Sequence, residues 1–173
     1  MIPYRKIESW EYFHLPLEVE TTPFPVFDRI LSLWAGKRGG RPMPAWSDFD
    51  IADFVGWHRH IILHEVTGPP FDLYCRLFGT FPTEAYGVNL TGRTVRNAAP
   101  RIETANDLAH LEKLATEQRI GCCSGTRYWS GKEFITMAFL ELPLSDDGQA
   151  VTHFLILTVD LPPAARAAHA TVR

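Results

Sequence analysis

The chain contains little cysteine and no long apolar run. Only Cys75, Cys122 and Cys123 occur, and two of them are adjacent, so the sequence indicates no disulfide framework and favours a reducing compartment. No run approaches the ~18 apolar residues of a membrane-spanning helix. Charges and prolines interrupt the start of the chain, where a signal peptide requires an apolar core. These absences predict a cytoplasmic protein without a membrane partner.

An excess of positive charge is also missing. The formal charge of -3 and the sequence pI of about 6.1 give no basic surface for a phosphate backbone, so no nucleic-acid partner is predicted. Gly36, Gly39 and Gly40 do not follow a strand and open a helix, as a phosphate-binding loop requires. With no catalytic motif elsewhere, the sequence does not indicate an enzyme.

The length of 173 residues suits one domain, which buries roughly two-thirds of the surface that the unfolded chain exposes. We predict a lead segment over residues 1–23, a single domain over residues 24–161 and a tail over residues 162–173. Two longer helices follow from apolar residues at helical spacing. The first carries Phe24, Phe27, Ile30, Leu31 and Trp34.

The second helix begins near Thr104 and Asp107, which form a capping-box-like start, and it ends at Gly121. A loop is predicted over residues 39–44, because its glycines and prolines weaken or cannot continue a helix. Five runs rich in β-branched and aromatic residues predict antiparallel strands: 57–66, 71–80, 122–129, 133–142 and 150–161. The expected class is therefore α+β.

Several short motifs, taken in order, resemble the PAS domain family, in particular a bacterial subfamily. They are Trp34, Arg38-Gly39-Gly40-Arg41-Pro42-Met43-Pro44, Asp48-Phe49-Asp50, Tyr74-Cys75-Arg76-Leu77-Phe78-Gly79-Thr80 and Leu90-Thr91-Gly92-Arg93. The resemblance covers roughly residues 26–160. It implies a five-stranded antiparallel sheet with flanking helices, preceded here by an extra N-terminal helix, and a pocket between sheet and helices. PAS domains use this pocket for small molecules or cofactors, or they dimerise.

The candidate ligand-binding residues combine arginines with aromatic and apolar side chains, because pockets are mostly apolar with few polar anchors. An inward Arg76 or Arg93 could hold an anionic group. Alternatively, Arg76 faces solvent or pairs with an acidic residue, Arg93 fixes a turn, and the apolar set fills a dry core. The full set is Tyr74, Arg76, Phe78, Tyr86, Arg93, Trp129, Met137 and Phe139.

Histidine and cysteine provide the weaker alternatives. His58, His60 and His64 share one parity in the predicted strand and could hold a metal. Because no further ligand completes the set, a polar face that is exposed or lies at an interface is the preferred explanation. Two further ideas have no supporting motif: a Cys122 or Cys123 nucleophile with His110 or His153 as base, and haem ligation by His110. The sequence names no cofactor.

The function expected from these patterns is a stand-alone PAS-like sensory or regulatory module that binds a small molecule. Because no effector unit is visible, the signal would pass through a homodimer or a separate effector protein. A pocket-less protein interaction module is the first alternative. A small metal-dependent enzyme on the histidine face is the second.

Overall fold

The structure is a computed structural model that describes residues 1–98, 102–127, 129 and 131–162. Its centre is a seven-stranded antiparallel sheet with the strand order β1-β2-β5-β6-β7-β3-β4. The strands are β1 (Arg5–Ile7), β2 (Trp10–Leu15), β3 (Ile61–Thr67), β4 (Asp72–Phe78), β5 (Ile120–Arg127), β6 (Lys132–Leu144) and β7 (His153–Leu161). The chain is therefore α+β.

The five later strands overlap the five predicted runs, but the sheet has two more strands than the sequence predicted. The additional strands form a hairpin within the lead segment, and β2 extends the sheet by pairing with β5. In β2, Phe13 and Leu15 are buried on one face of the sheet, and Tyr12 is buried on the other. This alternation of aromatic and apolar residues is the ordinary pattern of a strand covered on both faces. The segment predicted as a lead, residues 1–23, therefore contributes two strands to the sheet.

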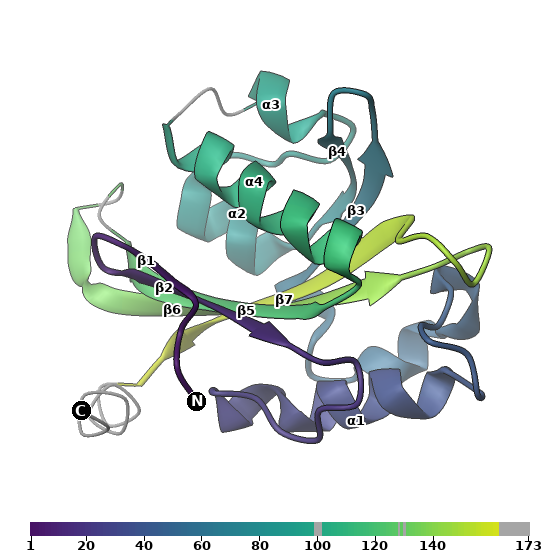
Figure 1. Ribbon diagram of the computed structural model, residues 1–173. Coiled ribbons are helices and arrows are strands. Elements are labelled where there is room, and N and C mark those ends of the chain that lie inside the picture. The colour runs from purple at the N-terminus through teal and green to yellow at the C-terminus, as the bar shows by residue number, and fades with distance from the viewer. Residues whose placement is uncertain (99–101, 128, 130, 163–173) are drawn as a thin grey trace.

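Helices cover both faces of the sheet (Figure 1). On one face lie α2 (Thr80–Tyr86), α3 (Val95–Ala98) and α4 (Ile102–Glu117), and on the other lies α1 (Asp28–Lys37). Short 3-10 helices complete the chain at Pro25–Phe27, Trp46–Asp48, Ile51–Phe54 and His58–His60. None of these described helices has the length and apolar character to cross a membrane.

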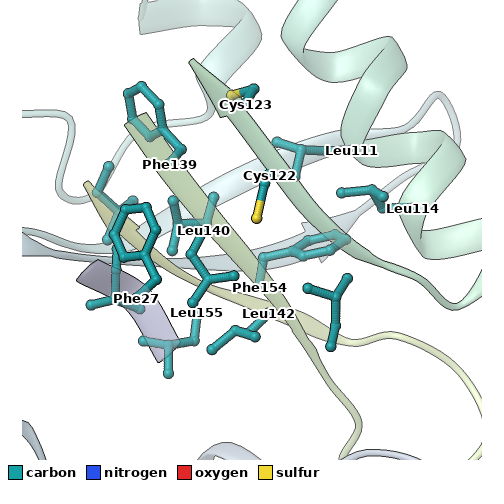
Figure 2. Close-up of a cluster of buried hydrophobic side chains, with 14 of the residues drawn as sticks. Phe27, Leu111, Leu114, Cys122, Cys123, Phe139, Leu140, Leu142, Phe154 and Leu155 are labelled. Carbon is teal, nitrogen blue, oxygen red and sulfur yellow. The ribbon is translucent and has the colours of Figure 1, made fainter. Parts of the chain in front are cut away.

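The α1 face of the sheet is a closed core. Phe27, Ile30, Leu31 and Trp34 are fully or almost fully buried, and the indole of Trp34 donates a 3.0 Å hydrogen bond to the carbonyl of Pro143 in β6. Figure 2 shows Phe27 close to the leucines of β6 and β7, among them Leu140 and Leu155. The helical spacing of these apolar residues thus buries one side of α1 against the sheet.

The motifs that carried the PAS resemblance in the first half mainly stabilise loops. The Arg41 guanidinium lies 2.6 Å from the Asp48 carboxylate, which also accepts a 2.7 Å hydrogen bond from the amide of Ala45. Arg38 donates to the carbonyls of Arg41 and Leu17. Residues 39–44 form the predicted loop after α1. The helix predicted from Thr104 to Gly121 already includes Ile102 and ends at Glu117. The tail beyond Pro162 lies outside the described residues.

Candidate functional site

A cavity of about 410 Å³ lies between the sheet and helices α2, α3 and α4. Strands β2, β3, β5, β6 and β7 supply its floor through Tyr12, Ile62, Cys123, Phe139 and Ile156. The β1–β2 hairpin closes part of one end through Ile7, Glu8 and Trp10. The volume lies within the range of small-molecule sites, which are typically ~300–1,000 Å³.

Four of the eight residues chosen from the sequence line this cavity. They come from separate parts of the chain: Phe78 ends β4, Tyr86 ends α2, Trp129 lies between β5 and β6, and Phe139 lies in β6. Their convergence gives the cavity its aromatic character. It does not by itself assign them a ligand.

The other four lie outside the cavity lining. Arg76 is exposed and donates a 2.6 Å hydrogen bond to Glu65, and its guanidinium lies 5.2 Å from the centroid of the Tyr74 ring. Leu73 and Cys75 of β4 are buried, so the strand alternation directs Tyr74 and Arg76 to the opposite face. An inward Arg76 therefore does not occur.

Arg93 and Met137 have structural positions. The backbone of Arg93 belongs to a turn, where its amide donates to the Leu90 carbonyl and its carbonyl accepts from the Cys75 amide. Its side chain is exposed. Met137 is completely buried and does not line the cavity, although it shares a strand parity with Phe139. Strand parity alone does not distinguish a filled position from a cavity wall.

Trp10, Trp129 and Tyr86 form an aromatic wall along the cavity. Trp129 stacks on Tyr86 with ring centroids 4.9 Å apart and on Trp10 with centroids 6.2 Å apart. The Trp129 indole donates a 3.0 Å hydrogen bond to the carbonyl of Ala85, which anchors it to α2. A side chain at Gly125 would collide with the Trp10 ring, so the glycine makes room for this wall.

A buried carboxylate forms the polar part of the floor. Glu141 is 5% exposed, and its Oε2 lies 2.7 Å from Nε2 of His110 on α4. The hydroxyl of Tyr4 lies 2.8 Å from the other ring nitrogen of His110. The Cys123 thiol faces Oε1 of Glu141 at 3.7 Å. Gly121 makes room for this carboxylate, because a Cβ at that position would collide with Glu141.

The neighbours of the carboxylates keep their protons. Burial and the Glu141 carboxylate raise the pKa of the Cys123 thiol well above its usual value. Burial and the Asp107 carboxylate likewise raise the pKa of Tyr12, whose hydroxyl donates a 3.3 Å hydrogen bond to Asp107. Both groups therefore act as hydrogen-bond donors at neutral pH.

His64 is a second buried polar group at the cavity. It is 6% exposed and lines the cavity from β3, and its Nδ1 is buried without a hydrogen-bond partner among the described residues. Burial lowers its pKa to about 4, so the imidazole is neutral at pH 7. A neutral imidazole offers one donor and one acceptor.

The predicted histidine face does not form. His58 and His60 lie in a 3-10 helix before β3, where their rings contact the carbonyls of Ile51 and Thr158 at 2.9 and 2.8 Å. Only His64 belongs to the strand, which begins at Ile61. Within the described ranges, no three metal-ligating side chains converge. The parity argument failed because the chain is not extended over residues 58–60.

The cysteines are poorly suited to nucleophilic chemistry. Cys122 and Cys123 point to opposite faces of β5 (Figure 2), and burial raises the pKa of both thiols. Burial also raises the pKa of Cys75 to about 12. His110 is 1% exposed and has both ring nitrogens in hydrogen-bond contacts, so its present geometry leaves no nitrogen for haem iron. His153 lies 3.4 Å from Asp146.

Sequence reasoning missed Trp10, Tyr12 and Glu141 as cavity residues. Glu141 had a recognisable signal, because it is the one carboxylate inside a long apolar strand run, where a charge requires partners. Trp10 and Tyr12 were missed with the strand that carries them. No family model matches the sequence, and the search of curated proteins finds no match.

Proposed function

We propose that the chain is a PAS-like sensory or regulatory module that binds a small molecule in the cavity between the sheet and helices α2–α4. The observation that carries this proposal is the cavity of about 410 Å³, whose walls combine stacked aromatics with a few buried polar groups. Such a combination is typical of ligand sites. Strands β3 to β7 with helices over one face agree with what the PAS resemblance implies.

The β1–β2 hairpin is the element through which occupancy would reach a dimer or an effector protein. Ile7 and Trp10 line the cavity, whereas Lys6 and Glu11 form an ion pair on the outside of the same hairpin. A ligand shifts this element only if it binds one arrangement of the hairpin more tightly than another. The buried free cysteines suit the reducing interior of a cell, where we expect the module to act.

The first test compares the native and denatured masses of the purified protein and adds a titration with Nile red, a neutral apolar dye. A retained mass, or dye fluorescence that saturates at one dye per chain, is expected. The matched variants are Ala98→Trp, which fills the cavity, and Asn97→Trp, which adds the same side chain at an exposed position of α3.

We expect Ala98→Trp to lose the dye or the retained mass and Asn97→Trp to keep it. Binding that is equal in the two variants would contradict the proposal. If the wild-type chain retains no mass and binds no dye, the pocket-less interaction module becomes the better description.

A further inference from the structure

The charge at the cavity floor limits what the cavity can accept. One oxygen of Glu141 lies 2.7 Å from Nε2 of His110, and the other accepts a hydrogen bond from the Cys123 thiol. Burial raises the pKa of the Tyr4 phenol, which therefore keeps a proton to donate to His110. Carboxylate oxygens together accept about four hydrogen bonds, so capacity remains toward the cavity.

The other charges at the cavity have the same sign. Asp107 and Glu8 lie at its exposed end, and among the described residues no lysine or arginine lines it. Arg5 does not line the cavity but contacts two residues that do: it donates a 3.0 Å hydrogen bond to Asn106, and its guanidinium carbon lies 6.0 Å from the centroid of the Tyr12 ring. An anionic ligand would meet Glu141 without a compensating cation, which opposes its binding. A cationic group would instead gain a charge-assisted hydrogen bond.

The aromatic wall also favours a ligand with a positive charge. Aromatic side chains begin beside Glu141: Phe139 lies two residues away on the same face of β6, and its partner Cys123 in β5 pairs with Tyr12 of β2. Trp10 continues this aromatic lining, with its ring centroid 5.9 Å from that of Phe139. Aromatic faces attract ammonium groups and also bury the apolar part of an organic ligand. The part of the cavity beside Glu141 is therefore suited to an ammonium group bonded to an apolar body.

His64 provides an independent sign of a missing partner. Its Nδ1 is buried without a partner in the described chain, although buried polar nitrogens are nearly always hydrogen-bonded. Glu141 in β6 pairs with Ile156 in β7, which pairs in turn with Ile62 in β3. His64 lies two residues after Ile62 in the same strand. Two strand spacings and one two-residue step separate the backbones of Glu141 and His64 by roughly 12 Å. Both side chains line the same cavity from these separate strands.

We propose that the cavity binds an aromatic organic amine, with its ammonium group at Glu141, its ring against the aromatic wall and a hydrogen-bonding group directed to His64. This inference rests on the proposed ligand-binding function and specifies the ligand class. Tyramine has all three features and serves as the probe. Its neutral analogue is 4-hydroxyphenylethanol and its anionic analogue is 4-hydroxyphenylacetate. A third analogue, 2-phenylethylamine, lacks only the phenolic hydroxyl group.

Isothermal titration calorimetry of the wild-type chain at pH 7 tests the charge preference directly. We expect tyramine to bind at least about tenfold more tightly than 4-hydroxyphenylethanol, as one charge-assisted hydrogen bond implies, and 4-hydroxyphenylacetate to bind weakest. 2-Phenylethylamine should bind more weakly than tyramine because it leaves His64 without a partner.

Variants then assign the preference to residues. Glu141→Gln should remove the difference between tyramine and 4-hydroxyphenylethanol while retaining binding of the alcohol. Glu65→Gln, which changes a carboxylate paired with Arg76 outside the cavity, should keep the wild-type preference. His64→Leu should reduce tyramine binding to the level of 2-phenylethylamine.

Three results would overturn the amine proposal: a carboxylate analogue that binds as tightly as tyramine, a preference that persists in Glu141→Gln, or no binding of any probe. The first and third need only the wild-type chain, so the proposal remains falsifiable if a variant fails to fold. If these probes fail while Nile red or a retained mass still occupies the cavity, the amine inference falls and the proposed function stands. If all fail, both fall.

Discussion

The two faces of the sheet are built from similar residue types but are filled differently. Beneath α1, the side chains of Phe27, Trp34 and the β6 leucines are fully buried. Beneath α2–α4, comparable aromatics surround a cavity that also contains Glu141 and His64. Buried polar groups, rather than apolar composition, therefore distinguish the face with the cavity from the face beneath α1.

The largest effect is expected from a truncation on the closed face. Trp34→Ala removes a fully buried indole and its hydrogen bond to Pro143, so we expect a loss of about 3–5 kcal/mol in the free energy of unfolding. Trp10→Ala, in the cavity wall, should cost less, because Trp10 is only partly buried. Chemical denaturation at pH 7 measures both. Equal losses would contradict the contrast between the faces.

The second effect is a pH dependence that originates on the cavity face. Burial lowers the pKa of His64 in the folded chain to about 4 from 6.5, so below pH 6.5 the unfolded state binds the proton first. Stability should therefore fall as the pH drops from about 6.5 to about 4, by about 3 kcal/mol for this residue.

His64→Leu should reduce this pH slope when urea denaturation is followed between pH 7 and pH 4. His14 leaves part of the slope in the variant, because burial and His110 lower its pKa to about 4 as well. His58→Gln, on an exposed 3-10 helix, is the matched control and should leave the slope unchanged. A slope that His64→Leu does not alter would refute the assignment.

A smaller effect concerns the room made for Glu141. In Gly121→Ala the added methyl group collides with Glu141 and Leu114, and overpacking of this kind costs about 1–3 kcal/mol. Gly36→Ala is the control, since its Cβ meets no atom and alanine is the better helix former in α1. Thermal unfolding should rank Gly36→Ala at or above the wild type and Gly121→Ala below it. The reverse order would show that the floor is not tightly packed.

Much of the framework could be predicted because its signals are local. Strand runs and helical spacing depend on neighbouring residues, and the predicted runs overlap β3 to β7, α1 and α4. The hairpin of β1 and β2 was missed because its pairing with β5 joins residues more than a hundred positions apart. A short strand is identified by its partner as much as by its own residues.

The site was harder to predict because neither residue type nor strand parity decides which side chains reach it. Phe78 and Phe139 line the cavity, whereas Met137 is buried in a filled position. Glu141 is distinguished only by being charged inside an apolar strand. His64 was assigned to a metal face because residues 58–60 were expected to be extended, and they form a 3-10 helix.

The smallest effect is expected at Arg76, the arginine that the sequence offered as a ligand anchor. Its partner Glu65 lies on the same exposed surface, and surface ion pairs contribute about 0–1 kcal/mol. Arg76→Ala should therefore change the free energy of unfolding by less than about 1 kcal/mol and leave dye binding in the cavity unchanged. Glu65→Ala, the matched change of its partner, should behave alike. A strong loss of dye binding in Arg76→Ala alone would indicate that Arg76 contacts the ligand. The binding site would then lie at β4 rather than at the part of the cavity floor that contains Glu141.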